Sequence, residues 1–290
     1  MSPQEATSLI EQDIKNNDVI FPYLNGDDVN SSIGQLATRY VINFQTMSLE
    51  EAEKYSACFA IVKARVAPYR ATITKQVHET DYWKFWDKRI SSYEKIADFD
   101  RVLVAARAAK DVQLTWVKNR QVFSDQLVVF LTDCSGAFAV LQSSIHSIWA
   151  WERCTGMWGA GIRYAPSKAV STFPIPFDTS FLFSIGEEYF RYRLNCEQEQ
   201  KLGLTAIYNQ FHDSTISSRW KTRLRELHCE LDRKVLTAYG WDDILLEHDF
   251  RVLQRGSRFS LSDRNNTEIL NRITQLNQRI NTTSRQRKGQ

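Results

Sequence analysis

The sequence predicts an α+β fold: a mixed domain with a short β-meander over residues 1–177, followed by a helical C-terminal subdomain over residues 178–290. In the first part, short β-rich runs alternate with polar turns and a few helical segments. After Pro176, apolar residues instead recur at helical spacing. With 290 residues, 43% of them hydrophobic, the chain can bury a substantial core.

The first elements follow from capping signals and β-rich runs. Ser2 and Glu5 form a capping box at the start of a helix expected over residues 3–16, and a proline at its first position suits that start. Residues 19–24 and 40–44 are predicted strands, because both are rich in β-formers and are separated by Asn, Asp, Gly and Ser.

Further helical segments follow before the meander. Ser48 with Glu51 predicts a second helix up to about residue 66, where Pro68 stops it. The aromatic stretch YWKFWDKRISSYEKIA, residues 82–97, has the character of another helix.

Three β-rich runs, at residues 102–106, 112–117 and 126–132, are joined by polar turns and predict the meander. Apolar residues between 138 and 149 then share one helical face. A glycine-rich loop over residues 156–161 leads into a short strand that begins at position 162.

The remaining chain is predicted to be helical. Apolar stripes at residues 185–196 and 224–238 indicate two long helices. Gly240 ends the second, with Trp241 placed to pack back on its last turn. A final helix is expected over residues 263–280.

The amino-acid composition argues against several classes of protein. The net charge is only +3, so any nucleic-acid surface must come from local clustering of Lys and Arg and should be sensitive to salt. No apolar run reaches the ~20 residues of a membrane span, and the N-terminus lacks the apolar stretch of a signal peptide. Five widely spaced cysteines without a CxxC indicate reduced thiols in a cytoplasmic protein rather than disulfides or a zinc site.

The sequence lacks the motifs that a DNA methyltransferase requires. None of the six prolines is adjacent to another, which excludes the NPPY motif that holds a flipped adenine. The G-x-G at residues 159–161 follows a predicted helix rather than a strand, so we interpret it as a loop and not as a cofactor site. No P-loop is present. We therefore expect no catalytic or cofactor-binding residues in this chain.

Nuclease and hydrolase chemistry are also poorly supported, and no metal site is expected. The D-x-K fragments at residues 13–15 and 232–234 lie in predicted helices, where charged surfaces produce such triplets by chance. His212 with Asp213, and His228 with Asp232, are spaced to pair, and we interpret such pairs as surface hydrogen bonds.

Three places combine basic side chains with planar ones, as a DNA reader requires. The first is the aromatic stretch with Lys84, Lys88 and Arg89, for which a packed helix with a solvated basic face is the alternative. The second is the set Arg101, Arg107 and Lys110 beside the meander, which could equally be ordinary strand-end charge.

The third place is the glycine loop between Arg153 and Lys168, with Trp158, Arg163 and Tyr164. A loop held between a helix and a short strand is suited to placing side chains in a groove. The alternative is a structural loop in which an arginine caps a helix end.

The chain also resembles the target-recognition and C-terminal region of MmeI-like type IIG restriction-modification enzymes, which are adenine-specific DNA methyltransferases. The similarity is carried by blocks in the family's order: PYLNGDDVNSS, ATRYVINF, EEAEKY, FWDKR, QVFSDQLVVF, LQSSIHSIWA, RYAPS, TFPIP, GLTAIYNQFHD and LRELHCELDRKVLTAYGWDD.

The resemblance implies a DNA-recognition module braced by helices, which is not itself catalytic. It places base-reading positions at Gly159, Gly161 and Arg163, with Gln126 as a second candidate. Arg163 is suited to guanine, whereas two glycines where the family reads bases imply relaxed specificity or recognition through Trp158.

The implied partners are double-stranded DNA and a methylase domain or subunit, which would hold the S-adenosylmethionine. Met1 falls within the helix that connects the family's methylase to this region. We therefore expect a separate specificity polypeptide, a truncated product or a remnant. The alternative function is an inactive remnant acting at most as a protein-interaction module.

Overall fold

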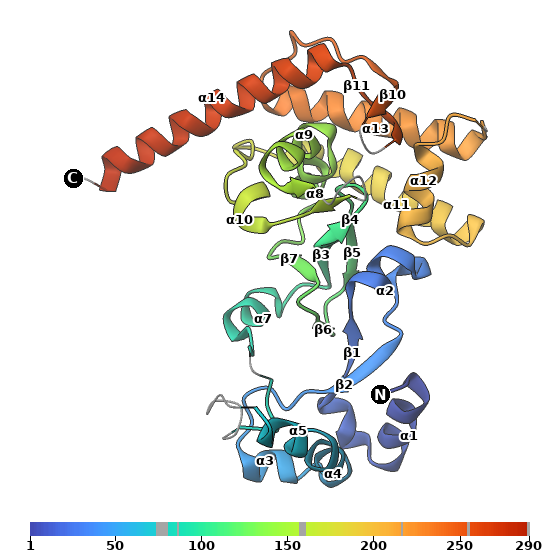
Figure 1. Ribbon diagram of the computed structural model, residues 1–290, viewed down its shortest axis with the longest axis vertical. Helices are drawn as coiled ribbons and strands as arrows, with labels where there is room; N and C mark the ends of the chain where they lie inside the picture. The colour runs from blue at the N-terminus through green and yellow to red at the C-terminus, as the bar shows by residue number, and fades with distance from the viewer. Residues whose placement is uncertain (74–80, 86, 157–160, 216, 254–255, 289–290) are drawn as a thin grey trace. The chain divides into compact units, whose positions relative to one another are not determined.

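The computed structural model describes residues 1–73, 81–85, 87–156, 161–215, 217–253 and 256–288, except for the side chains of 281 and 283–288 (Figure 1). Its contacts divide the chain into two units of discontinuous segments. Unit 1 comprises Met1–Asn25, Leu36–Asp100 and Lys118–Ser124, and unit 2 comprises Gly26–Gln35, Arg101–Val117 and Asp125–Gln290. Small sheets combined with helices confirm the α+β class, and the boundary near residue 177 stays a prediction.

Unit 1 contains a three-stranded sheet in the order β2-β1-β6. Strand β1 (Ile20–Leu24) pairs antiparallel with β2 (Arg39–Ile42) and parallel with β6 (Val122–Phe123). Its helices are α1 (Pro3–Gln12), α3 (Leu49–Glu53), α4 (Ser56–Arg65), α5 (Ala67–Ala71) and α7 (Ile90–Ile96). A core with Phe44 and Phe59 at its centre joins α1, the sheet, α3 and α4.

Ser2 and Ser48 are N-caps as predicted, but in the described residues the reciprocal bonds of a capping box are formed only by Ser48 and Glu51, since Glu5 pairs with Arg65. The helices are also shorter than predicted. Ser2 and Ser48 each accept a hydrogen bond from the first turn of the helix that follows. Helix α1 ends at Gln12, because Asp13 caps a separate 3₁₀ turn, Ile14–Asp18.

The prediction of a helix from residue 82 was wrong: the described residues of 82–89 form turns and irregular backbone, and helix α7 begins only at Ile90. The rings of Tyr82 and Trp83 pack against the core of unit 1, whereas Phe85 is exposed.

Unit 2 is built on a second sheet, in the order β5-β3-β7. Its strands are β3 (Arg101–Ala106), β5 (Leu114–Lys118) and β7 (Leu127–Phe130). The three predicted strands are confirmed, but a meander would place the middle run at the centre. The most continuously apolar run, β3, occupies the centre instead, where both of its edges are paired.

Helices pack on one another in succession next to this sheet (Figure 1). Phe138 of α8 (Ser135–Gln142) contacts Trp116 of β5 and also Tyr189 of α11 (Phe183–Gln200). Tyr189 in turn contacts His228 of α13 (Arg219–Ala238). Ser143 ends α8 and caps α9 (Ser144–Arg153), so the single apolar face predicted here spans two helices.

Unit 2 also contains three shorter helices that precede α13 in the sequence. They are α2 (Gly26–Ser31), α10 (Pro166–Ala169) and α12 (Leu204–Phe211). The segment rich in Asn, Asp, Gly and Ser between the first two predicted strands is partly helical, because consecutive Asp27 and Asp28 favour the positive end of a helix as well as a turn.

The C-terminal part is helical with one exception. Gly240 adopts the left-handed conformation predicted for a helix end, with φ of +69°, and Trp241 stacks on Tyr239. A hairpin of β10 (His248–Leu253) and β11 (Gly256–Leu261), absent from the prediction, precedes α14 (Asp263–Lys288). Of the helices in the described ranges, none has the length and hydropathy needed to cross a bilayer.

Candidate functional site

A small sheet places Arg163 at its centre. Strand β9 (Ile162–Arg163) lies between β4 (Ala108–Ala109) and β8 (Thr155–Gly156), and both pairings are antiparallel. Side chains alternate along a strand, and the two neighbours of Arg163 are both buried, Ile162 at 0% and Tyr164 at 2% exposure. Arg163 is therefore directed outward, and its side chain is exposed.

The backbone of Arg107 joins this small sheet to the larger one. Its N–H donates to the carbonyl of Gln126 at 2.8 Å, which extends the β3–β7 pairing by one residue. Its carbonyl accepts from the N–H of Tyr164 at 2.8 Å. Arg107 thus joins the two segments that were predicted to contact bases, QVFSDQLVVF and the strand with Arg163.

A third segment, from helix α2, is bonded to the same place. The N–H of Gly26 donates to Oε1 of Gln126 at 3.1 Å, across 100 positions of sequence. Asn30 donates from Nδ2 to the carbonyl of Ala108 at 3.4 Å. The block PYLNGDDVNSS therefore supports the same site, and these contacts were missed because no local pattern predicts them.

Gly161 has a structural reason to be glycine. Its φ is +144°, and a Cβ at this position would lie 2.2 Å from the carbonyl oxygen of Ala109. Any side chain would both adopt a rare conformation and collide with the neighbouring strand. The glycine permits the close approach of β9 to β4, so its presence does not mean that a reading side chain was simply lost.

The predicted site residues differ in exposure. Arg107, Lys110, Gln126, Arg163 and Lys168 have exposed side chains. Within the described part of the chain, no ion pair involves Arg107, Arg163 or Lys168, whereas Lys110 contacts Asn209 through Nζ at 3.3 Å. The predicted residues Trp158 and Gly159 lie outside the described residues.

Tyr164 is a support rather than an exposed contact. Its hydroxyl lies 2.8 Å from Nε2 of His146, and burial raises the pKa of Tyr164 well above its usual value. Burial also lowers the pKa of His146 to about 3, so the imidazole is neutral. The buried contact between Tyr164 and His146 fixes the backbone immediately after Arg163.

Three basic residues of the other two candidate places, Lys84, Arg89 and Arg101, are held by internal contacts. Lys84 is only 13% exposed in its side chain and pairs with Asp81 at 3.5 Å. Arg89 pairs with Asp87 at 3.2 Å, while the nearby Lys88 is half-buried. Arg101 donates to Ser135 and Glu187 and lies over the ring of Trp116, so it is a structural residue.

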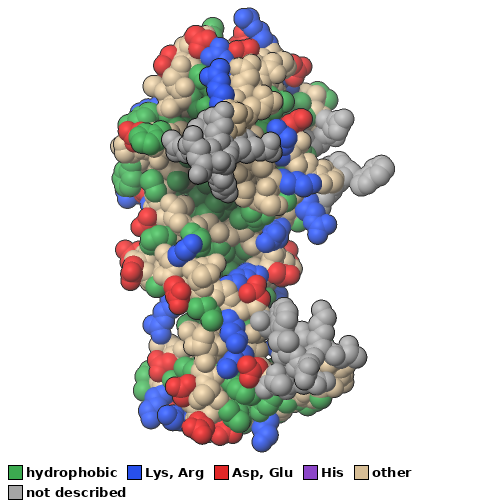
Figure 2. Space-filling model, turned by 90° about the vertical axis from the view of Figure 1, so that its left-hand side faces the viewer, with side chains coloured by type: hydrophobic (Ala, Val, Ile, Leu, Met, Phe, Trp, Pro, Cys, Tyr) green, Lys and Arg blue, Asp and Glu red, His purple; other side chains and the backbone are tan. Residues whose placement is uncertain are grey.

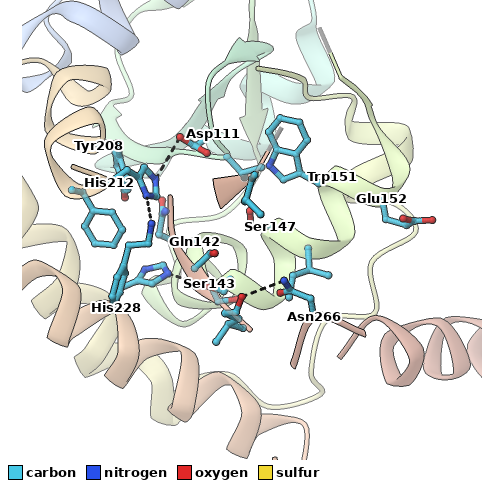
Figure 3. A pocket seen from close by; sticks show the side chains of 18 of the residues that line it. Asp111, Gln142, Ser143, Ser147, Trp151, Glu152, Tyr208, His212, His228 and Asn266 are labelled. Carbon is cyan, nitrogen blue, oxygen red and sulfur yellow. Dashed lines mark hydrogen bonds and ion pairs between the residues drawn. The ribbon is translucent and has the colours of Figure 1, made fainter. Parts of the chain in front are cut away.

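A cavity of about 680 Å³ lies within unit 2, among α9, α12, α13 and the β10–β11 hairpin (Figure 3). Its polar groups are largely engaged with one another: His212 lies 3.5 Å from Asp111, and Asn266 donates to the carbonyl of Leu261. His212 was expected to pair with Asp213, but Asp213 instead accepts from Thr215. The cavity is thus lined by an internally bonded network.

One corner of this cavity has residue types that suggest a catalytic triad. Oγ of Ser144 lies 2.9 Å from Nε2 of His228, and Oδ2 of Asp232 lies 3.5 Å from the same nitrogen. A triad needs the serine and the carboxylate on opposite ring nitrogens. The arrangement of Ser144, His228 and Asp232 is therefore not that of a catalytic triad.

The carboxylate of Asp232 instead joins three elements. It is fully buried, accepts from the N–H of Ser144 at 2.7 Å and lies 2.8 Å from Nε2 of His248. Burial opposes the charge on both partners, but the contact with Asp232 raises the pKa of His248 to about 9. His228 and His248 in turn hold the pKa of Asp232 below its usual value. The pair predicted to lie on the surface is therefore a buried structural network.

Lys and Arg side chains are interspersed with Asp and Glu side chains on the face drawn in Figure 2. In the described ranges, no group of three or more His, Cys, Asp or Glu residues is arranged to hold a metal ion. The exposed basic side chains at the junction of the sheets β5-β3-β7 and β4-β9-β8 are the best-formed candidate site.

The site therefore consists of the strand β9 with the exposed side chain of Arg163, and of the exposed Arg107 beside it, for which the described residues form no ion pair. The family model for the MmeI target recognition domain matches residues 1–177, and the chain belongs to this family. It is therefore a target-recognition module, and the recognition made from the sequence blocks is confirmed.

A solved structure of the Type IIL restriction-modification enzyme MmeI in complex with DNA has the same fold. The match covers 97% of this chain with a TM-score of 0.66 and 15% sequence identity. This chain spans 34% of the length of that protein. A search of curated proteins gave no match.

Proposed function

We propose that this chain reads the target sequence of an MmeI-like restriction-modification system by binding double-stranded DNA around Arg163. The observation that carries the proposal is the convergence of three distant segments at Arg107, whose backbone bonds to Gln126 and Tyr164. Nearby, α2 bonds to Gln126 and Ala108. This cross-linking holds exposed cations on a rigid support, as recognition of base edges requires.

The exposed residues divide into two roles. Arg163 is suited to guanine, since its guanidinium can donate two hydrogen bonds to the major-groove edge of that base. Lys168 and Arg107 are suited to phosphates, which fix the position of the protein without reading sequence. With a net charge of +3, the affinity should depend on these few contacts and fall steeply with salt.

In this proposal, the chain takes no cofactor and performs no chemistry. A methylase domain or subunit would bind S-adenosylmethionine and modify adenine at the site that this chain selects. A cytoplasmic location and a role in bacterial defence follow from such a system.

The test is binding to a randomised duplex library at about 50 mM and about 200 mM salt, with and without a methylase partner. We expect Arg163→Ala to remove preference at one base-pair position, and Arg163→Lys, which lacks the planar fork, to restore it poorly. Equal weakening of all sequences by Arg163→Ala would make Arg163 a phosphate contact. Absence of binding at every salt concentration, alone and with the methylase, would refute the proposal.

A second candidate function, a protein-interaction module, is supported by exposed apolar side chains after the recognition segments. Phe177 is fully exposed, and Ile175, Phe181 and Phe183 are 45%, 48% and 53% exposed. Phe177→Ser with Phe181→Ser should then abolish co-purification with the methylase and leave duplex binding intact. If DNA binding is absent and methylase binding is present, this second function replaces the first.

A further inference from the structure

Resting on the proposed function, we propose that Thr155 is a second specificity-determining residue, which reads the methyl group of a thymine next to the base pair read by Arg163. The starting observation is the register of the small sheet. Thr155 lies directly opposite Arg163 in the β8–β9 pair, and Ala108 lies opposite Arg163 on the other side.

The three residues share one exposed face. Directly opposed residues of an antiparallel pair project their side chains to the same side, with Cβ atoms about 5 Å apart. All three residues are exposed, whereas Ile162 and Tyr164, which project to the other side, are buried. Arg163 therefore extends between two short side chains that do not obstruct the approach of a base edge.

Spacing assigns Thr155 to the neighbouring base pair. Adjacent strands lie about 4.8 Å apart, whereas successive base pairs are separated by about 3.4 Å. The proposal requires β8 to follow β9 along the axis of the duplex. In that orientation, a side chain one strand away from Arg163 reaches a base pair one step, and not several, from the one that Arg163 contacts. The length of a threonine is sufficient only if the strand lies close to the bases, which the small side chain of Ala108 permits.

The chemistry of Thr155 selects thymine. The side chain of Thr155 is exposed, and no hydrogen bond among the described residues involves its hydroxyl. Threonine and alanine methyl groups contact the C5-methyl group of thymine in the major groove, which no other base presents. The sheet thus combines a charged donor for guanine with an apolar contact for the next base.

The experiment uses the full chain and begins with its preferred duplex from library selection. The guanine read by Arg163 is identified as the position whose preference disappears in Arg163→Ala. Each thymine adjacent to that position is then replaced by uracil, which lacks only the methyl group. We expect binding of the wild-type chain to weaken about fourfold, the value of one buried methyl group.

Two variants separate the methyl group from the hydroxyl. Thr155→Ser removes the methyl group and should bind the thymine and uracil duplexes equally, whereas Thr155→Val should retain the preference for thymine. Thr222→Ser, at an exposed position on α13, is the matched control and should behave as wild type. Thermal unfolding of each variant confirms that the fold is retained.

The outcomes distinguish this inference from the proposed function. If the wild-type chain prefers a guanine that depends on Arg163, but has no adjacent thymine or tolerates uracil there, the role of Thr155 is refuted and the proposed function stands. Retention of the uracil effect in Thr155→Ser also refutes it. If the wild-type chain shows no sequence preference, the proposed function fails, and this inference fails with it.

Discussion

The basic residues of the aromatic segment in unit 1 and those around Arg163 in unit 2 differ in their surroundings. Lys84 lies against the ring of Trp83 and pairs with Asp81, and Arg89 pairs with Asp87. Arg163 and Lys168 are exposed and, in the described ranges, have no ion pair. A mixture of aromatic and basic residues is thus insufficient to predict a nucleic-acid site.

The two groups of basic residues also differ in the contacts that support them. In unit 1, Trp83 donates from its indole to the carbonyl of Met47 at 3.1 Å, and Tyr82 packs against Phe59. These aromatic residues belong to the core. In unit 2, the supporting contacts are made by backbone groups of Arg107 and Tyr164, which leave the side chains of Arg107 and Arg163 directed outward.

The largest loss of stability is expected for a substitution in the aromatic segment of unit 1. Trp83→Ala should lower the free energy of unfolding by about 3 kcal/mol, because it removes a large packed ring and one hydrogen bond. Trp83→Phe should restore part of the packing. Thermal unfolding and duplex binding are measured together, and we expect binding by the folded variant to be unchanged. A loss of DNA affinity with unchanged stability would instead make this segment a DNA contact.

The next largest effect is expected at Gly161, which directly precedes the strand that carries Arg163. Gly161→Ala should lower stability by about 2 kcal/mol and abolish sequence preference, because the new Cβ would displace β9 from Ala109. Gly156→Ala is the matched control, since its Cβ would lie 4.0 Å from the nearest atom, in Trp151. Denaturant unfolding and library selection measure both properties. Equal behaviour of the two variants would contradict the structural role assigned to Gly161.

Local patterns predicted the elements of the fold better than their arrangement. The runs at 102–106, 112–117 and 126–132 were found because β-branched and apolar residues cluster there. Their order in the sheet was not, because strand pairing is decided by long-range burial. The hairpin of β10 and β11 was missed because many of its residues are polar or only half-buried, which weakens the apolar alternation of a strand.

The candidate site was predicted in part. The family blocks directed attention to Arg163, and alternation along the strand explains why Tyr164 is buried beside it. The contact between Gly26 and Gln126 and the register that places Thr155 beside Arg163 depend on tertiary structure. Such contacts have no sequence signature, and they determine which exposed cations are rigidly held.

A third prediction concerns the buried support of unit 2 and its dependence on pH. His248 has a pKa raised from 6.5 to about 9 by Asp232, so its stabilising contribution is complete below pH 6.5 and is lost as the pH rises through 9. A pKa raised from 6.5 to about 9 corresponds to a loss of up to about 3 kcal/mol. Stability should be measured from pH 6 to 10 for wild type and His248→Gln, and the variant should lack this decline. Parallel curves would show that His248 is not charged in the folded state.

The smallest effect provides the most direct test of the comparison between the two groups of cations. Lys168→Ala should reduce the slope of log affinity against log salt concentration by about 0.9, the value for one phosphate contact. Lys84→Ala should leave that slope unchanged, because its ammonium group is already paired with Asp81. The measurement is duplex binding over a salt series, with thermal unfolding as a check on each fold. Equal reductions would mean that both groups contact phosphates, and that internal pairing of a lysine does not exclude it from the DNA surface.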